Sequence, residues 1–424
     1  MAIGQKDETK SKQKGMNFIM KINLNKNLFN LYSFLFIYTM INREFLLLGM
    51  DLRYVVLILG IFLVLISFIT RNKLDLKIEI TKNNSIDRIY KLLILLFIWS
   101  LFSNISWIWN GLEKFPKEII NQNILIFNNL LSIIVFKKFK KYIDEEKIKK
   151  MVIFSCAILV VSFILTGMGY SLSQISGSNV RSMVKASVGA TEHKNIFGGN
   201  FRIAGYAEDP NYASIFLVLG AITALQLNCK KKLRYMFFLI FLIAFGFSCS
   251  KTILISFILG MLYLFCIRTF KKRCFSKFVN IVFTIGIAIL VIILPISGLL
   301  STHTTMTTRF KMWNMAKVLF LNSPLIGNGI NSFKSYINAQ YNGLWYVQPH
   351  STYWQLLSET GMIGFIIFIK LMINCLNNSE LSKYNKYLLF IFFIFIINFE
   401  TIQLQIFVYI ILVLNLFSEK KLEV

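Results

Sequence analysis

The chain has 424 residues, of which 56% are hydrophobic and 16% are charged, and 41 of them are phenylalanine. This composition excludes an ordinary soluble globular domain. The formal net charge of +26 would point to nucleic acid in a soluble protein, but Lys and Arg here crowd every second loop between apolar runs, as cytoplasmic loops of membrane proteins do. We therefore expect an integral membrane protein without a nucleic-acid partner.

Apolar runs predict an all-α fold with about twelve transmembrane helices. Residues 1–27 are expected to form a basic cytosolic tail, because residues 1–15 are hydrophilic and lack the apolar core of a cleavable signal. Residues 28–170 are expected to form an N-terminal transmembrane scaffold. Its five spans are predicted at about 28–46, 54–70, 90–110, 119–136 and 150–168.

Two long loops divide the rest of the chain, at residues 171–211 and 298–350. Between them, residues 212–297 are predicted to hold spans at about 212–228, 235–250, 252–267 and 278–297. Residues 351–424 are predicted to hold a span that starts at Ser351 and a hairpin of spans at about 387–400 and 401–417. The basic loops place both termini in the cytosol and both long loops on the outer side.

Both long outer loops are candidates for function, because loops of this length in compact proteins are usually functional or disordered. All 3 histidines of the chain lie in them: His193 in the first, His303 and His350 in the second.

The first outer loop ends in FRIAGYAEDPNYAS, where Asp209 and Pro210 precede an apolar run. Asp is a favoured N-cap and Pro suits the first helical position, so this pair predicts a helix start. Arg202 lies near that helix N-terminus, whose free amides favour anions, and it is a candidate phosphate ligand. An ion pair with Glu208 or contact with lipid headgroups is the alternative.

The second outer loop contains an amphipathic stretch over residues 309–321, followed by a turn with Pro324, Gly327 and Gly329. We expect a helix on the outer surface with Arg309 directed toward a central cavity; a purely interfacial helix is the alternative. Its apolar face is expected at the lipid interface and includes Phe310, Trp313, Val318 and Leu321. The glycines are expected to serve the turn.

His350 stands at the start of the tenth predicted span, in the segment HSTYWQLLSETGMIG. A helix N-terminus disfavours a cationic imidazole, which suits His350 to act as a general base. Ser351, Gln355 and Glu359 share one helix face and form a polar stripe that enters the membrane. Glu359 is expected to face a cavity or a partner, because a carboxylate facing lipid is costly. An interfacial histidine and a packing role for Glu359 are the alternatives.

Three further features complete the candidate chemistry. Lys251 lies in a short outer turn and either joins an anion site or reaches lipid headgroups. Gly361 and Gly364 are expected to let the helix after His350 pack closely. No DxD pair, phosphate-binding glycine loop or GxSxG elbow occurs, so neither a metal nor a cofactor is expected. The 6 cysteines show no metal-type spacing, at Cys156, Cys229, Cys249, Cys266, Cys274 and Cys375.

The order of these motifs from Arg202 through Arg309 to His350, Ser351, Gly361 and Gly364 resembles the O-antigen polymerase and ligase superfamily. The resemblance implies a GT-C-like membrane glycosyltransferase of the bacterial inner membrane. Such enzymes move a glycan from a polyprenyl diphosphate carrier to an acceptor sugar hydroxyl without a metal. It also implies roles for three residues: His350 as the base, and Arg202 and Arg309 as the diphosphate clamp. Arg181 and Lys185 are alternative cations of the first loop.

Polymerases and ligases of this superfamily share these motifs. The bias toward Lys, Ile, Asn and Phe, with 5 prolines, is expected from AT-rich coding, and many such bacteria lack the lipopolysaccharide that a ligase needs. We therefore expect a polymerase of capsule, exopolysaccharide or O-antigen repeats, with membrane lipid, a flippase and a chain-length regulator as partners. The alternatives are a ligase and a polysaccharide exporter; the absence of midplane charges in both halves disfavours the exporter.

Overall fold

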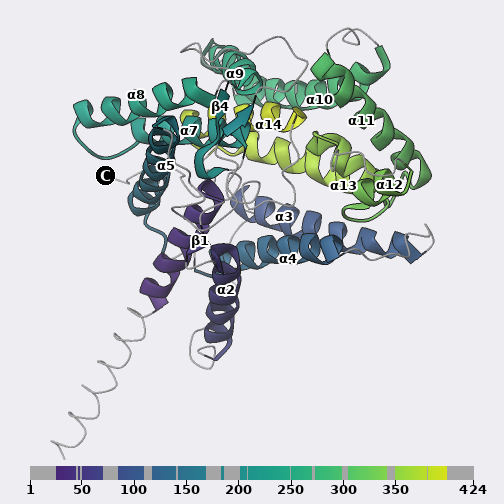
Figure 1. Cartoon of the computed structure of the whole chain (residues 1–424), viewed down its shortest axis with the longest axis horizontal. Coiled ribbons are helices and arrows are strands. Elements are labelled where there is room, and N and C mark those ends of the chain that lie inside the picture. Colours follow the sequence, from purple (N-terminus) through teal and green to yellow (C-terminus); the bar gives the residue numbers. More distant parts are fainter. Residues whose placement is uncertain are drawn as a thin grey trace, which may run out of the picture.

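The computed structural model of the protein describes residues 25–43, 46–47, 50–69, 85–108, 117–139, 142–168, 183–185, 201–207, 209–248, 250–269, 273–297, 304–340, 349–379 and 381–398. Helices dominate the described part (Figure 1). In the N-terminal half, residues 25–41 are helical, and α2 (Leu52–Ile69), α3 (Ser85–Phe102), α4 (Lys117–Lys138) and α5 (Glu145–Gly167) follow. The second half contains α7 (Pro210–Leu225), α8 (Lys231–Ser248), α9 (Lys251–Thr269), α10 (Arg273–Ser297), α11 (Thr304–Asn322), α12 (Ser332–Gln340), α13 (Thr352–Asn377) and α14 (Lys383–Phe395). Short 3-10 turns lie at η2 (Ser103–Ile108), η4 (Gly205–Ala207) and η5 (Ile396–Asn398).

Each predicted span from the first to the eleventh overlaps a described helix, whereas the predicted twelfth span, at residues 401–417, lies outside the described residues. Within the described part, 4 helices are long and apolar enough to cross a membrane: residues 87–107, α5, residues 276–293 and α13. Shorter apolar helices occur at residues 52–67, at α7 and at residues 251–267. These helices are those of an all-α membrane protein, as the composition predicted.

Two small antiparallel sheets depart from the predicted all-α architecture. Strands β1 (Leu46–Leu47) and β2 (Met50–Asp51) form a tight hairpin between the first two helices. In the first long loop, β3 (Met183–Lys185) pairs with β4 (Phe201–Ile203), so that Val184 lies opposite Arg202. Pairing with β3 satisfies backbone groups that a loop would otherwise leave to water. The hairpin thus anchors the loop residue Arg202 to a defined backbone.

Two contacts show that α14 runs antiparallel to both α7 and α13. Tyr353 at the start of α13 donates to the Phe393 carbonyl near the end of α14, over 3.1 Å. The ring of Phe395 lies 6.3 Å from that of Tyr212 in the first turn of α7. The starts of α7 and α13 and the end of α14 therefore lie at one end of the bundle, called here the first end.

The opposite end carries the basic loops. Lys149 near the start of α5 bonds the Gln226 carbonyl after α7 over 3.2 Å, and Ser382 before α14 bonds the Gln226 side chain over 3.5 Å. Lys149 also pairs with Glu145 over 2.8 Å. The basic segments at residues 147–150, 230–234 and 383–386 therefore lie at this end. The charge pattern predicted that they share one side of the membrane.

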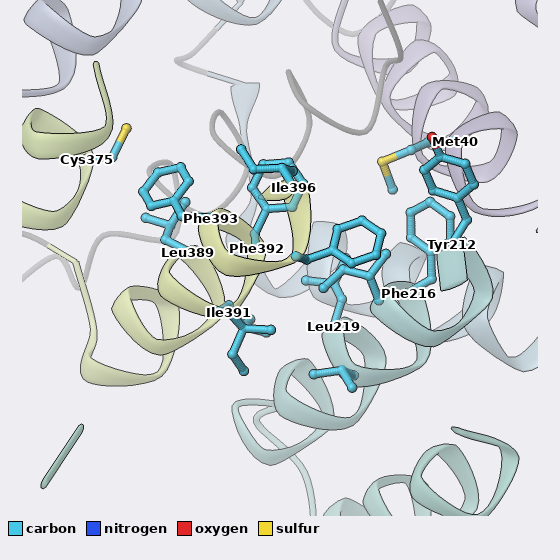
Figure 2. Close-up of a cluster of buried hydrophobic side chains, with 14 of the residues drawn as sticks. Met40, Tyr212, Phe216, Leu219, Cys375, Leu389, Ile391, Phe392, Phe393 and Ile396 are labelled. Atoms are coloured by element: carbon cyan, nitrogen blue, oxygen red, sulfur yellow. The ribbon is translucent and has the colours of Figure 1, made fainter. Parts of the chain in front are cut away.

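Helix α14 lies at the centre of the apolar core. Figure 2 shows its side chains between Cys375 of α13 on one side and Tyr212, Phe216 and Leu219 of α7 on the other. Leu389, Phe392 and Phe393 of α14 are completely buried. By contrast, α8, α9 and α10 expose rows of large apolar side chains such as Ile243, Phe265 and Ile293. Such surfaces suit contact with lipid tails, because burial in lipid removes them from water.

Candidate functional site

Asp209 and Pro210 start α7, as the sequence predicted. Asp209 is the N-cap, with its carboxylate accepting from the Asn211 backbone N–H over 2.7 Å, and Pro210 is the first helical residue. This carboxylate also accepts from the Asn211 side-chain amide over 2.9 Å. Asp209 thereby orients Asn211, whose amide oxygen is turned toward the residues described next.

Arg202 of β4 is held by two neutral acceptors. Its Nε donates to the Ser248 carbonyl at the end of α8, and its Nη2 donates to Asn211 Oδ1, each over 2.9 Å. Asn211 Oδ1 also accepts from Ser250 Oγ over 2.8 Å. The guanidinium is therefore fixed beside the N-termini of two helices, α7 and α9. Amide N–H groups at those ends and the arginine together favour an anion.

Lys251 is the first residue of α9 and its side chain is exposed. Since Ser250, its neighbour, contacts Asn211, the turn between α8 and α9 brings Lys251 to the same corner as Arg202. We call Arg202, Asn211, Ser250 and Lys251 the cationic corner.

Helix α11 confirms the helix predicted within the second outer loop. Its apolar residues, however, lie on different sides. Phe310 and Trp313 are buried, whereas Val318 and Leu321 are 47% and 61% exposed. The prediction that all four apolar residues face the lipid interface was therefore wrong for Phe310 and Trp313. The reason is tertiary, since α11 packs along α13, and the buried side of α11 extends from Phe310 to Leu319. Arg309 is half-buried near the start of the helix.

Asn328 joins α11 to α13. Its buried amide nitrogen donates to the Leu319 carbonyl of α11 over 2.6 Å and to the Ser358 carbonyl of α13 over 2.9 Å. Arg309 precedes Leu319 by ten residues, which is about 15 Å at the helical rise. His350 precedes Ser358 by eight residues, which is about 12 Å. His350 directly precedes α13 and therefore lies at the first end of the bundle.

Gly361 interrupts α13 with φ 66° and ψ −170°, a conformation that only glycine adopts readily. The turn at residues 323–331 enters this break. Asn328 and Gly329 donate their backbone N–H groups to the carbonyls of Ser358 and Glu359, over 3.0 and 2.9 Å. Beyond the break, the N–H of Met362 donates to the Pro324 carbonyl over 2.8 Å. The turn therefore replaces helical hydrogen bonds that the break removes.

The glycines of this region serve close backbone contact. A Cβ at Gly327 would meet the Glu359 carbonyl, and one at Gly361 would meet the Leu325 carbonyl. Gly327 and Gly329 have φ of 86° and 89°, which bears out their predicted role in the turn. Gly364 contacts Trp99 of α3, whose indole N–H donates to the Thr360 carbonyl over 2.9 Å. Gly364 thus packs closely as predicted, but Gly361 forms a break.

The predicted polar stripe is present and buried. Ser351, Gln355 and Glu359 are 0%, 1% and 2% exposed, and Gln355 Nε2 donates to Glu359 Oε2 over 3.2 Å. His350 is half-buried, with φ 48°, and immediately precedes the helix. A carboxylate in this position receives support from an amide on its own helix face and does not face lipid.

The structure places the cationic corner and the start of α13 at the same end of the bundle, joined through α14. Lys185, the alternative cation, lies in β3 opposite Phe201, whereas Arg181, His193, His303 and Glu208 lie outside the described residues. In the described part of the chain, no group of three or more His, Cys, Asp or Glu residues is arranged to hold a metal ion.

Comparison with known proteins shows a similarity over part of the chain. Residues 214–369 match the family model described as O-antigen ligase. Over this segment the chain is similar to the O-antigen polymerase and ligase superfamily. The matched segment runs from α7 into α13 and includes Lys251, Arg309, His350 and Glu359, whereas Arg202 precedes it.

A curated relative supports the same assignment. A protein of Rickettsia bellii (strain RML369-C), provisionally named a polysaccharide ligase, is 24% identical over 275 residues, or 61% of this chain. The match spans 62% of the length of that relative. No solved structure matches the chain.

Sequence reasoning missed Asn211, Asn328 and Trp99, which hold the site together. Asn211 stands two residues after a predicted N-cap, where an amide readily bonds the cap, and this spacing was an available signal. Asn328 lies between two turn glycines and Trp99 in an apolar run. Their partners are distant in the chain, so no local pattern reveals them.

Proposed function

We propose that this protein is a polysaccharide polymerase of the bacterial inner membrane, which transfers a glycan from a polyprenyl diphosphate carrier to an acceptor sugar hydroxyl on the outer face. The observation that carries the proposal is the position of the cationic corner and of His350 at one end of the bundle, away from the basic loops. A base and a fixed positive charge at one membrane face are the two requirements of this transfer.

In the proposed reaction, His350 accepts the proton of the acceptor hydroxyl as its oxygen attacks the anomeric carbon of the donor glycan. The bond between that carbon and the diphosphate oxygen breaks, and the diphosphate leaves with the electron pair. Arg202 and Lys251, beside the N-termini of α7 and α9, stabilise the charge that develops on the leaving group, and Arg309 adds charge from α11. No step in this scheme uses a metal.

The base assignment is tested by His350→Ala. We expect the purified variant to insert and fold, but to transfer glycan about 10²- to 10⁴-fold more slowly, the usual contribution of a positioned general base. The assay follows elongation of lipid-linked repeats extracted from the parent strain after deletion of the gene. His303→Ala, which changes the other histidine of the same loop, serves as the control and should retain activity. Wild-type elongation by His350→Ala would refute the role of His350.

A ligase is the second candidate, favoured by the description of the matching family model and by the name of the Rickettsia relative. The two functions leave different intermediates in a deletion strain. Mass analysis of carrier-linked glycans should find single repeats if the protein is a polymerase. Long chains that remain on the carrier would instead identify a ligase that transfers finished glycans to another acceptor.

A further inference from the structure

The start of α13 differs from the starts of α5, α7 and α14. The side chains of Asp144, Asp209 and Ser382 each accept a backbone N–H of the helix that they cap. Ser351, the N-cap of α13, makes no such bond. Its hydroxyl is fully buried and has no hydrogen-bond partner in the part of the chain that the structure describes. Capping therefore does not explain a serine at this position.

Gln355, one helical turn further on, also carries a buried polar atom whose hydrogen bonding is unsatisfied. Its amide nitrogen donates to the Glu359 carboxylate, which fixes the direction of the amide because the amide oxygen would be repelled there. Gln355 Oε1 is buried and has no hydrogen-bond partner among the described residues. Buried polar atoms are usually satisfied in proteins, and these two lie four residues apart on one helix face beside His350, where a single bound molecule can reach both.

The chemistry of these atoms defines the partner. An amide oxygen only accepts hydrogen bonds, and the carboxylate of Glu359 beyond it excludes anions. A diphosphate offers acceptors alone, so it suits the cationic corner and not this stripe. A sugar hydroxyl both donates and accepts, and it can therefore bond Gln355 Oε1 and Ser351 Oγ. A neutral polyol is the ligand class that satisfies both atoms.

We propose that Ser351 and Gln355 form the subsite for hydroxyl groups of the acceptor sugar, an inference that rests on the function proposed above. The subsite begins at the residue next to His350, so a hydroxyl held there lies beside the proposed base. The glycan acceptor and the diphosphate donor would thus occupy separate places: the acceptor along the start of α13, the donor at the cationic corner.

The test uses Ser351→Ala and Gln355→Met in the purified full-length protein. The donor is the lipid-linked repeat from the deletion strain, and the acceptor is the same repeat oligosaccharide released from its lipid by mild acid. Each variant should raise the KM for the free oligosaccharide about tenfold, the effect of one lost neutral hydrogen bond, and leave the donor KM unchanged. Ser351→Ala should not lower the melting temperature, because the hydroxyl that it removes bonds none of the described residues.

Ser382→Ala is the matched control, because Ser382 caps α14 through a bond from the Asn385 N–H over 3.2 Å. This variant should lower the melting temperature and leave the acceptor KM unchanged. Unchanged acceptor KM in both stripe variants, or a rise in the donor KM instead, would overturn the subsite while the proposed function stands.

Calorimetric titration of the free oligosaccharide separates the remaining outcomes. If the wild type binds it more tightly than Ser351→Ala but transfers nothing, the proposed function fails and the subsite holds. A wild type that neither binds nor transfers it would overturn both proposals.

Discussion

Single residues in the segment from His350 to Gly364 have distinct roles, which cannot be told apart from their spacing in the sequence alone. His350 is positioned to exchange protons, Ser351 and Gln355 carry unsatisfied polar atoms, and Gly361 breaks the helix. The break lets the turn at residues 323–331 bond both halves of α13. Gly361 therefore fixes the half-helix that carries the polar stripe, although it lies about two turns from Gln355.

At this scale, we expect Gly361→Ala to destabilise the protein by more than about 2 kcal/mol. An alanine there would adopt an unfavourable backbone conformation, and its Cβ would meet the Leu325 carbonyl. Thermal unfolding in detergent measures the loss. Gly286→Ala in α10 is the control, because nothing lies within 4 Å of a Cβ at that position, and a helical alanine should be neutral or stabilising. Equal stability of the two variants would contradict the account of the break.

Among the elements, α11, the turn at residues 323–331 and the first half of α13 act as one unit. Asn328 ties the two helices through a single amide nitrogen, with 2.6 and 2.9 Å to the two carbonyls. Trp99 ties the same half-helix to α3. Because Arg309 and His350 lie on different helices, their relative position depends on this tie.

We expect Asn328→Ala to lower kcat of glycan transfer about tenfold or more, with small changes in both KM values, because Arg309 and His350 lose their mutual alignment. The distribution of distances between nitroxide labels at the exposed residues Lys311 and Lys370 should broaden in this variant. Asn374→Ala is the control, since the Asn374 side-chain amide donates to a carbonyl of its own helix, that of Lys370, over 2.7 Å. An unbroadened distance distribution with full kcat would show that Asn328 does not position the site.

For the molecule as a whole, the two ends of the bundle differ in chemistry. One end gathers Lys149, Lys230 and Lys383 with the other basic loop residues, and the first end holds the cationic corner and the start of α13. Exposed apolar faces of α8, α9 and α10 lie between them. This distribution suits a protein that keeps its basic loops inside and its reaction outside.

The orientation predicts which cysteines a membrane-impermeant maleimide reaches in intact cells. A cysteine in place of Lys251 should be labelled from outside, whereas one in place of Lys231, at the opposite end, should be labelled only after the cells are broken. Labelling of the unmodified protein supplies the background from its own cysteines. Labelling of the Lys231→Cys variant in intact cells, with protection of Lys251→Cys, would reverse the proposed orientation and exclude transfer on the outer face.

The sequence alone determined the class of the protein and most of its helices. Apolar runs of spanning length have few alternatives to transmembrane helices, because lipid cannot satisfy free backbone groups. Local chemistry likewise predicted the start of α7, since Asp209 and Pro210 act on amides within their own turn. The clustering of Lys and Arg predicted which loops share an end, and the order of motifs predicted the superfamily.

Only the tertiary structure decided how the site is assembled. The bonds of Arg202 to Ser248 and of Asn328 to Ser358 join residues 46 and 30 positions apart. Such contacts depend on packing and leave no periodic trace in the chain. The burial of Phe310 and Trp313 in α11, and the break at Gly361 that receives a distant turn, have the same origin. Local sequence sets what a helix can expose, whereas its neighbours decide which side is covered.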